Sequence, residues 1–401
     1  MNRIVLGLSV LLASASAFAQ VITTDTTTNQ ALNSAQNIIN SDKTISIGGY
    51  GQIDYNQEMK QDVRSNGNLD VHRLVLFFGY RFSEKVQFVT EIEFEHVFEV
   101  GVEQAFINYN ITKGFNLRAG LMLIPMGIVN EYHESTTYNG VERPELDSKI
   151  VPSTWREMGA GFAGNIDNIS LKYQVYAVNG FLGYNGAGAF RGSDGLRKGR
   201  QKGAESTMSS PNLAAKVDFY GIKGLKLGAA GYFGNSQSTL YDDLPSSDTL
   251  NLGAMADSSV IGVSMLGLDA RYQYKAFEAR AQFIHATLSN SDEYNKLTGS
   301  DVGSSMMGYY GEMGYDLVSI FNKKAKQRLV LFGRYEFYDT HNSVAGDLVK
   351  NDAYARTDIT MGLTYHIANG AALKGDFQIR DNNAKGSDPY NQLNLGVAFW
   401  F

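Results

Sequence analysis

Few residues of this 401-residue chain stand at spacings that support catalysis or metal binding. The chain has no cysteine, which excludes thiolate nucleophiles, disulfides and cysteine-ligated zinc. The six histidines show neither HExxH nor CxxH-type spacing, and no GxSxG segment provides a serine nucleophile. The sequence therefore predicts no catalytic residue, no metal site and no cofactor. The histidines are His72, His96, His133, His285, His341 and His366.

Charged side chains are the remaining candidates, and they share one face of alternating segments. From Val86 onward apolar and polar residues alternate, so Glu91, Glu93 and Glu95 lie on one face of a predicted strand. A solvated acidic wall is the simpler interpretation, with an acid/base carboxylate pair or a cation site as the alternative. The same alternation recurs to the chain end and places basic residues on the charged faces. These residues are Arg73, Arg118, Lys172, Arg271, Arg280, Arg334, Lys374 and Arg380.

The alternating segments predict about 16 strands, separated by turn-forming Gly, Asn, Asp and Ser residues. Strands of about ten residues with one apolar and one charged face are typical of a transmembrane antiparallel β-barrel. A closed barrel leaves no backbone group unpaired in hydrocarbon, and one of this size encloses a water-filled lumen. The predicted strands are residues 45–56, 70–82, 85–97, 102–111, 115–124, 157–164, 168–178, 212–220, 224–235, 262–275, 277–288, 304–317, 327–340, 355–366, 370–381 and 391–401.

Short and long connections alternate between these strands. Tight turns such as 82–85 and 367–370 alternate with long polar segments such as 126–156 and 180–211. An outer-membrane barrel has short turns at one rim and long extracellular loops at the other, whereas such long loops are unusual in a compact soluble domain. Tyrosines near the strand ends are expected in the two interfacial girdles. They are Tyr50, Tyr55, Tyr80, Tyr109, Tyr173, Tyr274, Tyr335 and Tyr365.

The composition agrees with a β-barrel and excludes other classes. Aromatic residues make up 12% of the chain, glycine occurs 42 times and the mean hydropathy is −0.22. No later stretch of about 20 apolar residues is present, which excludes a helical membrane bundle. A net charge of −6 argues against a nucleic-acid partner. The hydropathy near zero is therefore the mean of an apolar lipid face and a charged lumen face.

The first 19 residues are expected to be a secretory signal peptide, with a positive start, a nine-residue apolar run and Ala17-Phe18-Ala19 at the cleavage site. Residues 20–43 are polar. Apolar spacing within 31–39 allows a short helix there, although a tether is the simpler interpretation. Residues 44–401 are expected to form the barrel, which places the protein in the outer membrane of a Gram-negative cell.

Two parts of the sequence resemble known outer-membrane proteins. The last strand ends at Phe401, which resembles the terminal signal that the barrel assembly machinery reads. Gly120–Gly127, Val141–Pro144 and Val151–Gly159 together resemble the phosphate-selective porin O/P family, in which a strand ending in a Pro-x-Gly turn leads into a long loop with an arginine-containing motif. The sharp match covers roughly residues 120–164, and the strand spacing agrees along nearly the whole mature chain.

The resemblance implies a 16-stranded homotrimeric porin in outer-membrane lipid and lipopolysaccharide, with a third extracellular loop that folds inward and narrows the channel. Met126–Arg156 is expected to be that constriction loop. In the family, phosphate selectivity comes from inward-facing arginines and lysines, although no contiguous motif assigns them here residue by residue. The charged candidates of the loop are Glu131, His133, Arg143, Glu145, Lys149 and Arg156.

Two other motifs have simpler interpretations. Gly159–Gly164 has the GxGxxG spacing of dinucleotide sites, but an alternating strand follows it instead of a helix. Glycines at a place where the inward loop packs closely explain it better. The basic cluster 197–202 lies in a long loop and is expected to be solvated, with anion collection at the mouth or binding of lipopolysaccharide phosphates as alternatives.

The leading hypothesis is a passive diffusion channel for small hydrophilic solutes or ions, with a preference for anions or phosphate. The acidic residues of the wall and the loop argue against a purely anionic path. The second hypothesis is a barrel with adhesive surface loops, or a barrel hydrolase that brings a serine to His285 or His366 across strands. A soluble secreted β protein is the third.

Overall fold

The computed structural model describes residues 32–242, 244–245, 247 and 251–401. Sixteen antiparallel strands hydrogen-bond in one closed ring. The barrel strands are β1 (Ile45–Met59), β2 (Asn68–Arg81), β3 (Val86–Glu95), β4 (Glu99–Thr112), β5 (Phe115–Leu123), β6 (Arg156–Ile166), β7 (Leu171–Val178), β9 (Asn212–Ile222), β10 (Leu225–Asn235), β12 (Gly262–Tyr274), β13 (Phe277–Ser289), β14 (Ser305–Asp316), β15 (Arg328–Ser343), β16 (Ala355–Ala368), β17 (Ala371–Asn382) and β18 (Tyr390–Trp400).

The remaining elements are short and lie in the connections. None of the helices within the described residues has the length and apolar character needed to cross a membrane. They are α1 (Ser34–Ile39), α2 (Leu146–Lys149), α3 (Leu252–Ser258), α4 (Ser291–Thr298), α5 (Val318–Phe321) and single 3₁₀ turns at Asp167–Ile169, Arg197–Gly199, Thr239–Tyr241 and Asp352–Tyr354. Two further strands, β8 (Leu182–Tyr184) and β11 (Gln237–Ser238), form a separate parallel pair.

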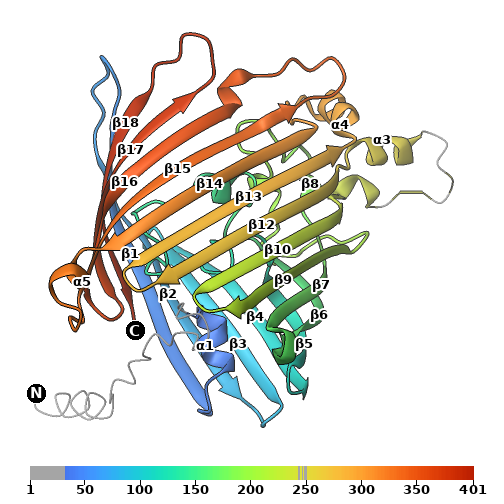
Figure 1. Ribbon diagram of the computed structural model, residues 1–401. Helices are drawn as coiled ribbons and strands as arrows, with labels where there is room; N and C mark the ends of the chain where they lie inside the picture. Colours follow the sequence, from blue (N-terminus) through green and yellow to red (C-terminus); the bar gives the residue numbers. More distant parts are fainter. Residues whose placement is uncertain (1–31, 243, 246, 248–250) are drawn as a thin grey trace, which may run out of the picture.

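The pairing of β1 with β18 closes the barrel (Figure 1). It runs from Tyr50 opposite Trp400 to Met59 opposite Asn391. Every barrel strand therefore has a neighbour on both sides, which satisfies the backbone groups that hydrocarbon cannot hydrate. No edge strand of the barrel is left open.

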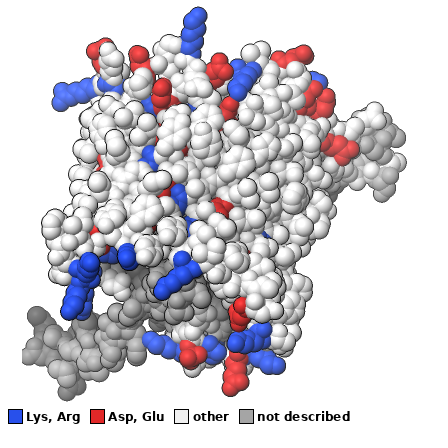
Figure 2. Space-filling model, viewed as in Figure 1, with Lys and Arg blue, Asp and Glu red and all other residues white. Residues whose placement is uncertain are grey.

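Alternation along each strand separates the two faces of the wall. On β12, Leu266 and Leu268 are 50% and 48% exposed on the outer surface, whereas Met265 and Asp269 are 0% and 6% exposed and point inward. Figure 2 shows the result on the whole molecule, because charged side chains gather at the two ends and the band between them is mostly uncharged. That band is the surface that lipid covers in a transmembrane barrel.

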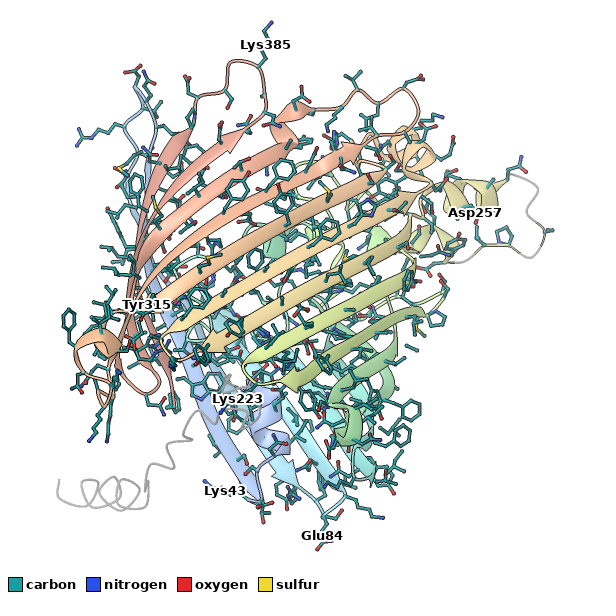
Figure 3. The ribbon with its side chains drawn as sticks, in the orientation of Figure 1. Lys43, Glu84, Lys223, Asp257, Tyr315 and Lys385 are labelled. Atoms are coloured by element: carbon teal, nitrogen blue, oxygen red, sulfur yellow. The ribbon has the colours of Figure 1, made fainter. Side chains whose placement is uncertain are left out.

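The two ends of the barrel differ in their connections. Figure 3 shows Lys43, Glu84 and Lys223 at one end, where the strands are joined mostly by short turns, and Asp257 and Lys385 at the other, where the long loops lie. We call these ends the turn rim and the loop rim. In outer-membrane barrels the short turns face the periplasm and the long loops face the exterior.

All sixteen predicted strands overlap barrel strands of the structure, so the predicted fold class and strand number are confirmed. Tyr50 is a correction: it is fully buried inside the barrel, where its ring stacks on Trp400 at 5.6 Å, and it is not a girdle residue. The tether interpretation is also wrong for Ser34–Ile39, which form α1 and pack against the inner wall. The signal peptide and residues 20–31 lie outside the described residues.

The depth of the apolar band gives a testable prediction. Leu268 stands midway along β12, and Ile222, which is 53% exposed, is the last residue of β9 at the turn rim. We expect Leu268→Arg to lower the free energy of unfolding by about 2–4 kcal/mol and Ile222→Arg by only about 0–1 kcal/mol, because a cation is costly only near the bilayer centre. Urea titration of vesicle-inserted protein, followed by heat-modifiable gel migration, measures both, and equal losses would contradict the assigned band.

Candidate functional site: the lumen and its constriction

The segment between β5 and β6, residues 124–155, folds into the lumen and reaches opposite walls. Lys216 of β9 donates a hydrogen bond to the Gly127 carbonyl at 2.8 Å, and the Val141 amide donates one to Asp376 of β17 at 2.6 Å. Because β9 and β17 lie on different sides of the ring, the segment crosses the lumen. We call residues 124–155 the constriction loop, and its course agrees with the inward fold that the sequence predicts.

Charged side chains of the wall hold the constriction loop in place. Lys374 donates a hydrogen bond to the Tyr138 carbonyl at 2.8 Å. Glu131 of the loop lies 2.7 Å from Lys216, which also lies 3.0 Å from Asp269. Burial raises the pKa of the Glu131 carboxyl, but the facing lysines hold that pKa well below its usual range. Loss of one partner from such a buried group costs about 3–5 kcal/mol, so the loop is firmly attached.

Most of the predicted wall cations are paired inside the barrel. Arg280 lies 3.2 Å from Glu312, and Arg380 lies 2.6 Å from Glu145 of the constriction loop. A cation that already faces a carboxylate attracts a passing anion only weakly, since the two charges largely cancel at a distance. The other contacts are Arg73 with Glu93 at 3.6 Å, Lys172 with Glu131 at 3.5 Å, Arg334 with Glu312 at 3.5 Å, Arg118 with Asn108 at 3.0 Å and Arg271 over the Tyr132 ring at 4.2 Å.

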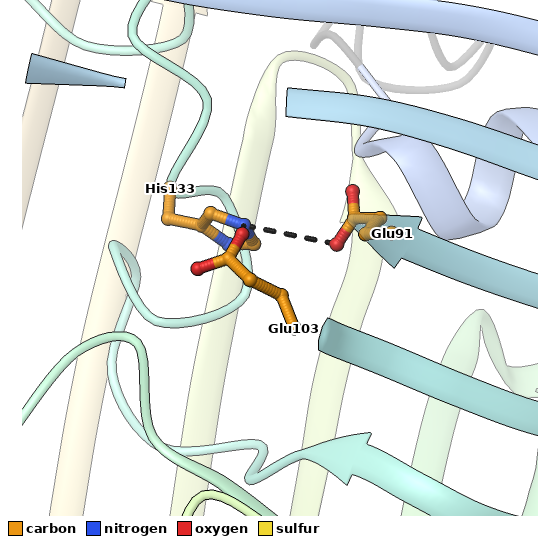
Figure 4. A group of neighbouring side chains, drawn as sticks. All are labelled: Glu91, Glu103 and His133. Atoms are coloured by element: carbon orange, nitrogen blue, oxygen red, sulfur yellow. Dashed lines mark hydrogen bonds and ion pairs between the residues drawn. The ribbon is translucent and has the colours of Figure 1, made fainter. Parts of the chain in front are cut away.

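A buried cluster joins the constriction loop to β3 and β4. His133 Nε2 lies 3.1 Å from a carboxylate oxygen of Glu103 and 3.8 Å from one of Glu91 (Figure 4). Tyr50 donates a hydrogen bond to Glu103 at 3.2 Å, and Ser34 of α1 donates one to Glu91. Burial opposes protonation of the imidazole, but the carboxylates of Glu103 and Glu91 raise the pKa of His133 to about 9. His133 is therefore a cation at neutral pH.

The same three side chains offer ligand atoms within 4.8 Å of one another, which is the one potential metal-ligand group among the described residues. Three of its four carboxylate oxygens already have hydrogen-bond partners, and the fourth, on Glu103, faces Arg156. Gln104 donates to Glu91 at 2.5 Å, and Arg156 lies 3.8 Å from Glu103. A protonated His133 next to Arg156 opposes a further cation, so the arrangement fits an ion-pair cluster better than a metal site.

The acidic row of β3 is placed differently from the prediction. Glu91 is 0% exposed beneath α1 and the constriction loop, and Glu93 is 5% exposed beside Arg73. Neither forms a solvated acidic wall, because Ser34 and His133 cover Glu91 and the neighbouring strand's Arg73 pairs with Glu93. Glu95, which is half-buried, faces the arginines of the loop rim.

The loop between β7 and β9, residues 179–211, packs against the constriction loop. Arg197 donates a hydrogen bond to the Ser153 carbonyl at 2.7 Å, and Arg200 donates one to the Pro152 carbonyl at 3.3 Å. Lys149 also joins the two loops through Asp194 at 3.7 Å. The basic cluster of this loop is therefore docked onto the channel constriction, which corrects the expectation of a solvated loop.

Two more arginines converge on the same short segment. Arg143 donates to the Ser153 hydroxyl at 3.1 Å, and Arg156 donates to the Thr154 hydroxyl at 3.0 Å. Residues 152–154 thus bring together guanidinium groups from the constriction loop, from β6 and from loop 179–211. We call Arg143, Arg156, Arg197, Arg200 and Lys202 the arginine cluster.

The cations of the arginine cluster destabilise one another. Burial and then the neighbouring Arg143 lower the pKa of Arg197, and burial and then Arg197 lower the pKa of Arg200. The pKa of Lys202 is lowered by burial and then by Arg200, with Glu95 acting in the opposite direction. An anion that binds between like charges held close together in this way relieves their repulsion and stabilises them.

Two remaining sequence motifs are explained by the wall itself. Gly159 and Gly161 lie within β6, and a Cβ atom at either would collide with a backbone oxygen of β7. The close neighbour is thus the adjacent strand and not the inward loop, and the motif is followed by a single 3₁₀ turn and β7 instead of an α-helix. His285 lies on the outer face of β13, opposite Leu266, so it does not reach the lumen. His366 lines the lumen beside Arg328.

A closed 16-stranded barrel whose lumen is narrowed by an inward loop defines an outer-membrane channel of the porin class. The chain belongs to the family described as phosphate-selective porin O and P, whose model matches residues 45–388. The resemblance found in the sequence is therefore confirmed, and family and fold indicate a channel rather than an enzyme.

Other proteins are similar to this chain in sequence or in fold. An uncharacterized protein of Aquifex aeolicus (strain VF5) is 34% identical over 366 residues, which cover 87% of this chain and 78% of that protein. The outer membrane channel DcaP of Acinetobacter baumannii has a TM-score of 0.56 at 13% identity, over 89% of this chain and 97% of its own. The anion-selective porin from Comamonas acidovorans has a TM-score of 0.54 at 11% identity, over 89% and 99%. At these identities the two structures show the fold alone.

The pKa of His133 gives a prediction about pH. Because that pKa is about 9 in the folded protein, above the unfolded value of about 6.5, the stability from protonated His133 is full below pH 6.5 and is lost as pH rises through 9. The groups that face it are Glu91, Glu103 and Glu134. We expect the difference in free energy of unfolding between wild type and His133→Gln to shrink by on the order of 3 kcal/mol from pH 6 to pH 10.

Urea titrations in lipid vesicles at the two pH values measure this difference. His285→Gln on the lipid face is the matched control and should show no such change. A difference between wild type and His133→Gln that is the same at pH 6 and pH 10 would show that His133 does not hold the loop as a cation.

Proposed function

We propose that the protein is an anion-preferring diffusion channel, with the arginine cluster as the element that attracts the solute. The observation that carries this proposal is the convergence of four arginines on residues 152–154, where Arg197 and Arg200 have no carboxylate partner within ion-pair distance among the described residues. Five of the eight predicted wall cations pair with acids, whereas the cluster brings several cations together at one place.

The chemistry of the cluster favours oxyanions. A guanidinium group presents planar pairs of N–H donors that match two oxygens of a phosphate or carboxylate. Some donors of Arg197 and Arg200 are used by backbone carbonyls, which fixes the direction of the rest. Rings of such cations in a pore favour anions without binding them so tightly that they cannot leave. Phosphate and small carboxylates are thus the expected solutes.

The lumen continues beyond the constriction toward the turn rim. A cavity of about 690 Å³ is lined by Tyr138 of the constriction loop, Arg280 and Arg328 of the wall and Asn369 of a short turn. Its charged and polar lining residues support passage of a hydrated solute through this part of the lumen. The acids that also line it, such as Glu278, keep the path from being strongly anionic along its whole length.

We further propose a homotrimer in the outer membrane, inserted by the barrel assembly machinery with Phe401 as its signal and surrounded by lipopolysaccharide at the loop rim. A trimeric form of OmpT of Vibrio cholerae with the same fold supports this proposal, with a TM-score of 0.52 at 11% identity over 89% of this chain and 99% of its own. Native gels of detergent-extracted protein before and after heating test it, and a single monomer band under both conditions would oppose it.

Selectivity of the reconstituted channel tests the main proposal. In planar bilayers with a KCl gradient we expect a reversal potential that indicates preference for chloride, and inorganic phosphate should reduce the chloride current. Protein that gives no stepwise conductance would contradict the channel, whereas a reversal potential of the opposite sign would contradict only the anion preference.

Variants of the arginine cluster give the matching prediction. Arg197→Gln/Arg200→Gln keeps hydrogen-bonding groups near Pro152 and Ser153 but removes two charges, so we expect the chloride-to-potassium permeability ratio to fall by roughly fivefold at low salt and by less at 1 M KCl. The control is Arg191→Gln/Lys385→Gln, which removes two exposed charges of the loop rim outside the cluster. Equal effects of the two double variants would show that the rim as a whole sets the selectivity.

A further inference from the structure

The short helix α1 lies inside the barrel, close to β2 and β3 near the turn rim (Figure 1). The Asn33 side chain caps it by accepting a hydrogen bond from the Gln36 amide at 2.9 Å. Ala35 and Ile38 are buried, and Ile38 packs against Gly79 of β2. A side chain at Gly79 would occupy the place of Ile38, so this glycine makes the space for the helix.

Polar contacts join α1 to the constriction loop and to the wall. Asn33 Nδ2 donates a hydrogen bond to the Glu131 carbonyl at 2.7 Å, and the Ser34 amide donates one to the Glu134 carboxylate at 2.7 Å. The Ser34 hydroxyl donates to Glu91 of β3. The helix therefore contacts two residues of the loop that flank the His133 cluster.

The far end of α1 is also held. Gln87 of β3 donates a hydrogen bond to the Ile39 carbonyl at 3.1 Å, and Arg81 of β2 donates one to the Ser41 carbonyl. A tether that merely led to the first strand would need none of these contacts. They fix both ends of the helix in the lumen.

The free space in the lumen is unequal on the two sides of the constriction loop. On the side of β12 to β16 a cavity of about 690 Å³ reaches from the loop to the turn rim. On the side of α1, a smaller cavity of about 40 Å³ lies among Gln36 and Ile39 of the segment and Phe106, Arg118 and Met122 of the wall. The buried side chains of α1 therefore occupy lumen space on this side.

We propose that α1 is a lumenal plug that sets the size limit of the channel. It closes the space between the constriction loop and the β2–β7 wall, and so confines solutes to the passage along β12 to β16. It also supports the constriction loop through the hydrogen bonds that Asn33 and Ser34 donate to it. The size limit for solutes, unlike the charge preference of the channel, is then set by a segment that precedes the barrel.

The position of α1 is testable because the chain has no cysteine of its own. A Cβ atom at Gly79 would lie 3.3 Å from Cβ of Ile38, near the 3.5–4.5 Å that a disulfide spans. We expect Ile38→Cys/Gly79→Cys to form a disulfide in the folded, membrane-inserted protein, seen as a shift in gel migration that a reducing agent reverses. The two single-cysteine variants are the controls. No disulfide in the folded channel would overturn the placement of α1.

The effect of α1 on the size limit of the channel is tested by a substitution whose added charge expels the helix from the lumen. Ser34→Glu puts a carboxylate against Glu91 and Glu134, whereas Ser41→Glu adds the same charge beyond the end of the helix. For Ser34→Glu we expect the single-channel conductance in 1 M KCl to rise by roughly twofold, because a helix about 10 Å across leaves the lumen. We also expect faster entry of large neutral sugars into vesicles. Ser41→Glu should behave as wild type.

These results separate the plug from the anion preference. Conductance and sugar entry that are the same in Ser34→Glu and wild type would overturn the plug, provided that the disulfide between positions 38 and 79 no longer forms in the charged variant. Where that disulfide still forms, deletion of residues 32–40 is the decisive variant, and unchanged conductance then overturns the proposal. The sign of the reversal potential tests the arginine cluster independently of either result.

Discussion

Backbone hydrogen bonding in the absence of water is the constraint on which the rest of the structure depends. A strand in hydrocarbon must have a partner on each side, and the pairing of β1 with β18 satisfies this for the whole ring. A closed ring of sixteen strands is too wide for wall side chains to fill. The lumen must then be filled by other parts of the chain or by water. Here the constriction loop and α1 fill part of it, and the remaining space is the channel.

The charges inside the lumen follow from the same geometry. Alternation directs polar residues inward, and a loop that crosses the lumen must meet them. Where loop and wall carry opposite charges they pair, as Glu145 does with Arg380 and Glu131 with Lys216. These pairs hold the loop but add little to selectivity, because they are balanced. The positive charge at residues 152–154 that lacks a carboxylate partner is what remains after this pairing, and it lies against the constriction loop itself.

The strands were predictable because their signal is local. A period of two over ten residues, with turn residues between, is enough to place all sixteen. The alternation of side chains along β1 also shows why Tyr50 is not a girdle residue. Tyr50 shares a face with Gln52 and Asp54, both of which point inward. An aromatic residue near a strand end belongs to the girdle only when the alternation of the strand directs its side chain outward.

The arrangement inside the lumen was not predictable in the same way. The sequence places Glu91 on an open wall, because nothing near it in the chain indicates that Ser34 and His133 cover it. The contacts of Arg197 and Arg200 join residues of two different loops, 44 and 48 positions apart in sequence. The spacing within residues 31–39 allows a helix without favouring it over a tether, and its place in the lumen depends on Gly79, whose role appears only when the barrel is closed.

Anomalous diffraction from crystals soaked in bromide measures directly where an anion rests in the lumen. The strongest lumenal bromide site is expected among Arg143, Arg197 and Arg200, with lower occupancy when phosphate is added. A parallel soak in rubidium should give no site there. Bromide found only on the outer surface, or rubidium in place of bromide at the arginine cluster, would contradict a channel in which uncompensated arginines select the solute.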